Sequence, residues 1–416
     1  KKMEVVRLQG GRNDLYIADS NFGMYKEDLE ACKALAQTQK IYGWPDHINA
    51  STGKNNKEKV LEAARVVNGS IVLSGSVQSL DKVVLENIKR KNISADDLMS
   101  LAKEADNVDA NSYCEIILGL PGDSKETHLE TLKTVVTAGF NKVIPYQLMI
   151  LSGSELGANE TVEKYNMSIR SRVLPRAFGS YDVCGETIVA ADIEDVCVAT
   201  NTMSFEDYMD CRVMHLVISI FFNDVVFETV LKALTVYNMS SFRWLELIKD
   251  CVSETRLASF FDEFRKCTDE ELWVDRKELE AFIQKEGTMD RYIRGEFGFN
   301  LLYTFKANAL VKYLDAVIEV VETAISLLIK EVHGQNDELE AFFETIIQWD
   351  GNRIQSIVLG LENKVECTMD YDIGSFADDI ETKPIIEYFY NDPVHLRYEL
   401  TDEQKESVRC SLSVFG

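Results

Sequence analysis

The sequence predicts an α/β protein with parallel strands in its first third, followed by a mainly helical C-terminal part. Two observations carry this prediction. Short apolar runs that end in small polar residues recur five times between residues 14 and 151, and the first four are each followed by a stretch with helical spacing of apolar residues. Beyond about residue 165 this alternation stops, and helical patterns dominate up to about residue 350.

The five expected strands alternate with four expected helices. The strands are 14–22, 47–53, 70–79, 113–124 and 142–151, and the helices are 26–39, 57–67, 80–90 and 125–139. Units of this kind are typical of parallel strands joined by crossover helices. The carboxyl ends of such strands meet along one rim, which is where parallel sheets and barrels bind ligands.

Small hydrogen-bonding side chains within the expected strands are placed near that rim. They are Asp19, Ser20, Asn21, Asn49, Ser51, Ser74, Ser76, Gln78, Ser79, Glu115 and Gln147. Such a rim would suit a polar ligand such as a nucleoside or an amino acid, although strand ends are also polar simply because loops are solvated. Glu115 favours the ligand interpretation because it interrupts an otherwise apolar strand, where an unpaired carboxylate is costly to bury.

The second half of the chain predicts helices. Ser204 is expected to cap a helix, with Asp207 three residues later completing a capping box. Residues 311–328 carry one apolar stripe that indicates a core helix. The acidic segment 370–381 lacks the ligand spacing of a calcium loop, and the tail from residue 385 is expected to dock onto the helices.

Composition excludes several classes of function. A formal charge of −25, from 69 acidic and 44 basic residues, disfavours nucleic acid as a partner. The most apolar stretch, 214–227, is too short and too polar to span a bilayer. Nine cysteines without a regular framework indicate reduced thiols and a cytoplasmic location. The five histidines have no metal-ligand spacing, so no metal site is expected, and no residue is identified as catalytic.

Five motifs carry a resemblance to a known family. In order they are LYIADSNFGM, INASTGK, LSGSVQSLDKVVLENIKRKN, EIILGLPGDSKETHLETL and YQLMILSGSEL, within residues 14–156. This order resembles the second to sixth strands of the radical S-adenosylmethionine (SAM) barrel, in the branch with an N-terminal cobalamin-binding domain. The resemblance implies an incomplete (β/α) barrel at 1–160, a mixed post-barrel segment at 161–212 and a mainly helical domain at 213–416.

The resemblance further implies that SAM is the cofactor, and it assigns contacts to individual residues. The methionine end of SAM would meet the turn formed by Asp19, Ser20, Asn21 and Phe22. Ser76 and Gln78 would line the site, and Arg90 would lie close to the carboxylate of SAM. The alternative for Arg90 is a solvated cation at the end of a helix.

Further expected contacts involve the fourth and fifth strands. Glu115 would accept a hydrogen bond from the ribose or the amino group of SAM. The backbone from Leu118 through Gly119 to Gly122 would pass beside the adenine, where glycine permits close approach. The remaining residues of the expected cofactor site are Asn49, Ser51 and Gln147.

One motif of the family is absent from this sequence. Its members hold a [4Fe–4S] cluster with a CxxxCxxC loop, whereas the two nearest cysteines here, Cys184 and Cys197, are 13 positions apart. We therefore expect the cluster loop, the first strand and the cobalamin domain to lie upstream of Lys1, so that cluster and cobalamin occur only in a longer protein. The chain would then be the inactive C-terminal part of a cobalamin-linked radical SAM enzyme.

Two functions follow from these patterns. The first is radical methyl transfer, or another modification of an unactivated carbon in a small-molecule substrate, by the longer protein. Its partners would be that substrate and the N-terminal half of the same polypeptide. The second is a non-catalytic module whose half-barrel binds a nucleoside-like ligand or a protein partner.

Overall fold

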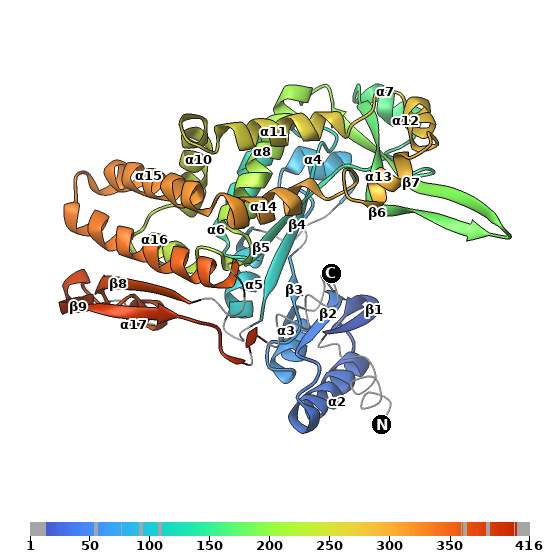
Figure 1. Cartoon of the computed structure of the whole chain (residues 1–416). Coiled ribbons are helices and arrows are strands. Elements are labelled where there is room, and N and C mark those ends of the chain that lie inside the picture. Colours follow the sequence, from blue (N-terminus) through green and yellow to red (C-terminus); the bar gives the residue numbers. More distant parts are fainter. Residues whose placement is uncertain are drawn as a thin grey trace.

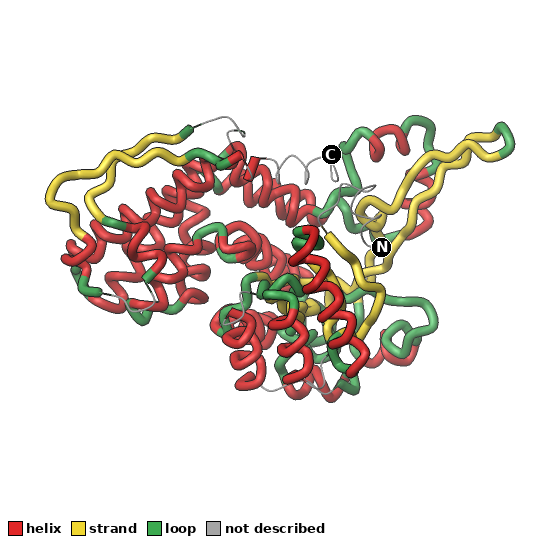
Figure 2. Tube along the Cα trace, turned by 90° about the horizontal axis from the view of Figure 1, so that it is seen from below, coloured by secondary structure: helices red, strands yellow, loops and turns green. Residues whose placement is uncertain are grey.

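The computed structural model describes residues 14–53, 57–75, 77–90, 95–106, 110–358, 360, 364–379, 383–402 and 404–405. The described part is a mixed α/β structure in which a parallel sheet lies beside a large group of helices (Figure 1). A long antiparallel hairpin extends from this body, and a second antiparallel pair lies at the far end of the helices. Figure 2 shows the same division between strands and helices from below.

Five parallel strands follow one another in chain order. They are β1 (Asp14–Phe22), β2 (His47–Thr52), β3 (Leu73–Ser74), β4 (Ser112–Leu118) and β5 (Lys142–Gln147). They form one sheet of β1 and β2 and another of β3, β4 and β5, and a parallel bridge between Ile48 and Ile71 links the two. The prediction of parallel strands is confirmed, and the described strands do not close into a barrel.

Five helices connect these strands. They are α2 (Lys26–Tyr42), α3 (Lys57–Val66), α4 (Lys82–Asn87), α5 (Ala95–Asp106) and α6 (Lys125–Thr137), of which α5 is absent from the sequence prediction. Burial alternates along β4, where Cys114 and Ile116 are fully buried in the core shared with the helices. Glu115 and Ile117 point to the other face, where Tyr146 of β5 is 49% exposed. One face of the sheet is therefore packed and the other is open.

A side chain covers the free edge of β5. The amide of Asn223 accepts a hydrogen bond from the backbone N–H of Val143 and donates one to its carbonyl, both at 2.8 Å. Asn223 thus satisfies backbone groups that a further strand would otherwise pair. At the opposite edge, β1 pairs only with β2 among the described residues.

A short helix and a long hairpin follow the parallel strands. They are α7 (Asn159–Lys164), β6 (Ser168–Val183) and β7 (Glu186–Ala199). The resemblance implied only a mixed segment at 161–212, and the pairing of β6 with β7 was not predicted. The far part of the hairpin is exposed and projects as an arm (Figure 1). The near part of β7 runs antiparallel to the segment after β5, through a bridge between Met149 and Val196.

The predicted helical region is confirmed. Ser204 and Asp207 form the expected capping box at the start of α8, whose buried residues pack between the sheet and the other helices. The apolar stripe predicted over residues 311–328 is divided between α14 and α15. Val311, at its start, is 59% exposed. The elements are α8 (Phe205–Phe221), η1 (Asn223–Val225), α9 (Glu228–Val236), α10 (Ser241–Cys251), η2 (Val252–Glu254), α11 (Ala258–Glu270), α12 (Arg276–Ile283), α13 (Thr288–Ile293), α14 (Leu301–Lys312), α15 (Leu314–His333) and α16 (Asp337–Val358).

The last described segment is not helical throughout. It comprises β8 (Val365–Tyr371), α17 (Ile373–Asp378), η3 (Ile385–Tyr388) and β9 (Phe389–Tyr398), with β8 and β9 antiparallel. The tail docks onto the helices as expected, since Tyr398 packs edge-on against Trp349 of α16 at 5.5 Å between ring centroids. No helix of the described residues is long and apolar enough to cross a membrane.

Candidate functional site

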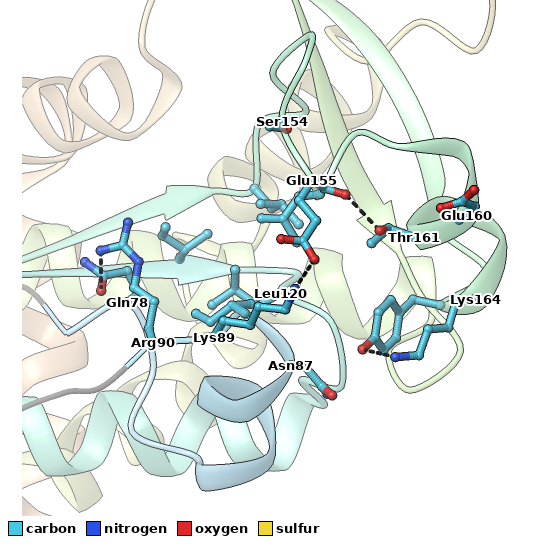
Figure 3. A pocket seen from close by; sticks show the side chains of 15 residues that line it. Gln78, Asn87, Lys89, Arg90, Leu120, Ser154, Glu155, Glu160, Thr161 and Lys164 are labelled. Atoms are coloured by element: carbon cyan, nitrogen blue, oxygen red, sulfur yellow. Dashed lines mark hydrogen bonds and ion pairs between the residues drawn. The ribbon is translucent and has the colours of Figure 1, made fainter.

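A cavity of about 530 Å³ lies at the carboxyl ends of the parallel strands. We call it the rim pocket. Its walls come from the loops that follow β3, β4 and β5 and from α7 (Figure 3). The lining residues are Gln78, 87–90, Ile117, Leu120, Leu148, 154–156, Glu160, Thr161, Lys164 and Tyr165. Its position matches the rim at which the sequence places a ligand.

Gln78 fixes one end of the rim pocket. Its backbone N–H donates to the Glu115 carbonyl at 3.1 Å, and its carbonyl accepts from the Ile117 N–H at 2.8 Å. These bonds hold Gln78 at a φ of 61°, a conformation that costs a non-glycine residue roughly 1 kcal/mol or more. The side chain then accepts a hydrogen bond of 3.4 Å from the Arg90 guanidinium, as Figure 3 shows.

The charged groups of the rim pocket differ in whether they are paired. Lys89 and Glu155 form an ion pair between the loop after α4 and the loop before α7 (Figure 3). Lys164 donates to the Tyr165 hydroxyl at 2.9 Å. Arg90 has no carboxylate partner among the described residues and bonds only to Gln78. An anionic group entering the rim pocket would therefore meet a cation that is held in place but not neutralised.

The loop after β4 passes close to β7. Gly119 has a φ of 86°, and a Cβ atom there would lie 3.1 Å from the Cys197 carbonyl oxygen. A side chain at this position would thus combine backbone strain with crowding. Leu118 is fully buried, and its carbonyl accepts from the Leu148 N–H at 2.9 Å. Glycine is therefore needed at position 119 because the loop packs closely against β7.

A buried chain of polar groups supports the same loop. Asp123 lies 3.3 Å from Nδ1 of His128, whose Nε2 is 2.8 Å from Nε2 of His215 on α8. One of the two imidazoles donates its Nε2–H to the Nε2 of the other. Burial holds the pKa of His215 well below its ordinary value, so this imidazole is neutral. The sequence did not reveal this pairing, because the two histidines are 87 positions apart.

Several predicted site residues lie on the open face of the sheet. Asn49 and Ser51 of β2 alternate with buried residues, as Glu115 does on β4. The Tyr146 hydroxyl donates to Glu115 at 3.4 Å, and burial together with the Glu115 charge raises the pKa of Tyr146 to about 12. None of these three predicted residues lines the rim pocket.

The predicted turn at the end of β1 also lies outside the rim pocket. The backbone N–H of Asn21 donates to the Asp19 carboxylate at 2.8 Å, and the Asn21 amide donates to Ser20 at 3.3 Å. These side chains are exposed, whereas Phe22 is buried in the core. Ser76 lies outside the described residues.

Gln147 points to the face opposite Glu115. Its amide contacts the Tyr208 hydroxyl on one side and the Arg172 guanidinium on the other. Because a guanidinium only donates, the amide oxygen faces Arg172, at 3.1 and 3.2 Å, and the NH₂ group donates to Tyr208. The polar atoms of Gln147 are therefore engaged within the protein.

The structure thus brings together two of the predicted side chains, Gln78 and Arg90, in one cavity. Lys89, Glu155, Glu160 and Lys164 complete its charged lining but were not predicted. A signal for Glu155 was present in the sequence, since it lies in the YQLMILSGSEL motif.

Comparison with known proteins identifies homologues. No family model matches the chain. Over 203 residues it is 30% identical to 2-(S-pantetheinyl)-carbapenam-3-carboxylate methyltransferase of Streptantibioticus cattleyicolor, covering 48% of this chain and 29% of that protein. Over 202 residues it is 29% identical to the cobalamin-dependent radical SAM methyltransferase TokK of Streptomyces tokunonensis, covering 47% and 29%. The matched part spans less than a third of either relative.

Solved structures give a weaker match. TsrM from Kitasatospora setae, a radical SAM methyltransferase with tryptophan and a SAM analogue bound, matches 44% of this chain and 35% of its own at 14% identity and a TM-score of 0.34. TsrM with cobalamin and a [4Fe–4S] cluster matches at 13% identity and a TM-score of 0.33. Scores of this size do not establish a common fold. By sequence, the chain is similar to two methyltransferases, and one of them, TokK, is a cobalamin-dependent radical SAM methyltransferase, the class of protein that the motifs predicted.

Proposed function

We propose that this chain supplies the SAM-binding strands and a helical substrate-side region of a cobalamin-dependent radical SAM methyltransferase. The observation that carries the proposal is the rim pocket. There Gln78 accepts a hydrogen bond from the Arg90 guanidinium, and Arg90 has no carboxylate partner among the described residues. Its volume of about 530 Å³ lies within the usual range of ligand pockets. Both residues stand at motif positions that the family uses for its cofactor.

In this proposal Arg90 binds the carboxylate of SAM in a charge-assisted hydrogen bond. Gln78 orients that guanidinium, and the backbone beside Gly119 approaches the adenine. Glu115 would accept from the ribose or the amino group of SAM across the open face of the sheet, and the turn made by Asp19, Ser20 and Asn21 would meet its methionine end. Asn49, Ser51 and Ser76 would line the rest of the site.

The residues that the structure describes do not fit an iron–sulfur cluster. Such a cluster needs several accessible thiolates, and the described residues contain no group of three His, Cys, Asp or Glu side chains placed to hold a metal. Cys32, Cys114, Cys197 and Cys211 are buried, and burial raises the pKa of Cys197 to about 11 and that of Cys211 to about 12. We propose that cluster and cobalamin are held by residues outside this sequence.

The first test is binding of S-adenosylhomocysteine, which has the carboxylate, ribose and adenine of SAM but cannot be cleaved reductively. Isothermal titration should show binding to this chain, and Arg90→Ala should weaken it about tenfold, because one charge-assisted hydrogen bond is lost. The matched control is Arg65→Ala, which removes an exposed arginine of α3 and should leave binding unchanged. A folded chain that binds nothing, or binds equally well without Arg90, would contradict the proposal.

The second test concerns catalysis by the chain alone. After treatment with iron and sulfide under anaerobic conditions and reduction with dithionite, it should form no 5′-deoxyadenosine from SAM above a protein-free control. The reason is that, within the described part of the chain, no three cysteines lie close enough together to hold one cluster. Chromatographic detection of 5′-deoxyadenosine in proportion to the protein would overturn this expectation.

A further inference from the structure

A second cavity, of about 400 Å³, lies beside β5 and is called here the side cavity. β5, the near parts of β6 and β7, α8 and the residues around the start of α14 enclose it. No residue lines both cavities, although Leu148 lines the rim pocket and the next residue, Met149, lines the side cavity. The two cavities are therefore distinct but adjacent.

Two arginines line the side cavity, and the first of them is saturated. Arg172 donates from Nε to Glu194 and from Nη1 to Glu271, both at 2.6 Å, and also contacts the Gln147 amide oxygen. Its side chain is 12% exposed. Two carboxylates and an amide leave Arg172 little capacity for a ligand, so its role is to fix the cavity wall.

The second arginine has no such partners. Arg212, on α8, is 3% exposed and makes no hydrogen bond or ion pair with any described residue. Its Nε is buried without a hydrogen-bond partner. The guanidinium lies over the ring of Phe264, with 5.9 Å between Cζ and the ring centroid. A guanidinium has five N–H donors, and leaving them unpaired away from water is unfavourable. The side cavity therefore contains an unused anion-binding group.

One acceptor in the same cavity is also unused. Oε1 of Glu194 bonds to Arg172, whereas its Oε2 is buried without a partner. Together the charges of Arg172, Arg212, Glu194 and Glu271 sum to zero. A ligand carboxylate would make this cluster negative overall. A hydrogen-bond donor on the same ligand would pair with the free oxygen of Glu194.

We propose that the side cavity binds a small organic carboxylate, with its carboxylate on Arg212 and a hydrogen-bond donor of the same molecule on Glu194. Leu174, Phe299 and Tyr303 supply apolar surface for the rest of the ligand. As an assignment of substrate class, the inference rests on the proposed function. The binding itself requires neither SAM nor a cluster, so it is tested separately.

The test uses three probes that share one skeleton. They are 3-phenylpropionate, its neutral amide 3-phenylpropanamide, and L-phenylalanine, which adds an ammonium donor. In saturation-transfer NMR titrations the amide should bind about tenfold more weakly than 3-phenylpropionate, because it cannot form the ion pair with Arg212. L-Phenylalanine should bind at least as tightly as 3-phenylpropionate. Equal affinity of carboxylate and amide, or no binding of any probe, would overturn the proposal.

The variant Arg212→Met separates ligand binding from structure. It should reduce 3-phenylpropionate affinity about tenfold, because it removes the guanidinium that would pair with the ligand carboxylate, and circular dichroism checks that the variant is folded. Arg256→Met, at an exposed arginine of the helical region, is the control and should bind like the wild type. Unchanged affinity in a folded Arg212→Met would contradict the inference. If that variant does not fold, the affinities of the wild type for 3-phenylpropionate and for its amide still test the proposal.

A final comparison distinguishes this ligand from the carboxylate of SAM itself. Saturating S-adenosylhomocysteine should not displace 3-phenylpropionate, and Arg212→Met should not weaken S-adenosylhomocysteine binding. Competition would assign Arg212 to SAM and overturn the inference. Loss of S-adenosylhomocysteine binding with retained carboxylate binding would contradict only the proposed function.

Discussion

Replacing Arg172 with methionine is expected to lower the free energy of unfolding by about 3–5 kcal/mol, because it leaves buried carboxylates without their cation. Both hydrogen bonds from Arg172, to Glu194 and to Glu271, measure 2.6 Å, and the Glu194 side chain is only 9% exposed. Methionine preserves most of the volume, so the loss would come from the charges rather than from a cavity. Urea unfolding followed by circular dichroism measures the effect.

Two controls define the cause of this loss. Arg256→Met breaks an ion pair with Glu319 in which both side chains are largely exposed, and should cost under about 1 kcal/mol. The double variant Arg172→Met/Glu194→Gln should be more stable than Arg172→Met, because one of the unpaired carboxylates is neutralised. If the double variant is less stable than Arg172→Met, uncompensated charge is not the reason for the lower stability of Arg172→Met.

Replacing Asp350 with alanine is expected to cost about 3 kcal/mol. This carboxylate of α16 is fully buried and caps the start of α9, accepting from the backbone N–H groups of Thr229 and Val230 at 3.0 Å and from the Thr229 hydroxyl at 2.9 Å. Alanine would leave these donors unsatisfied in the core. The control is Asp372→Ala, which removes the half-buried cap of α17 and should cost about 1 kcal/mol. Equal losses would contradict this account.

Asp350 should also give stability a pH dependence. Burial raises its pKa to about 6 in the folded protein, above its ordinary value of 3.8. The folded state therefore keeps this proton where the unfolded chain has released it, so the contribution is present below about pH 4 and is lost as pH rises through about 6. Relative to Asp350→Asn, the wild type should lose stability between those pH values. Urea midpoints at both ends of the window measure this, and a change of opposite sign would refute it.

The candidate site was predictable only in part. Gln78 and Arg90 stand in one motif, separated by a short helix, so local sequence places them near each other. Arg172 and Asp350 carried no signal, because their partners are far along the chain. Arg212 carried none because its burial without a hydrogen-bond partner depends on tertiary packing. Gln147 ends β5 as a rim residue would, but the alternation of side chains along the strand turns it to the face opposite Glu115. Side-chain direction at a strand end depends on register, which one sequence does not determine.

The sequence by itself determined the parallel strands, most of the crossover helices and the Ser204 cap, because apolar periodicity and capping are local properties of the chain. Only the tertiary structure decided that the described strands stay open, that β6 completes a long hairpin and that β8 pairs with β9. Pairing between strands depends on partners that are distant in sequence and on which apolar surface of the fold is still exposed to solvent. The same reason applies to the side cavity, since Arg212 is left unpaired by the packing of α8 against its neighbours rather than by any local pattern.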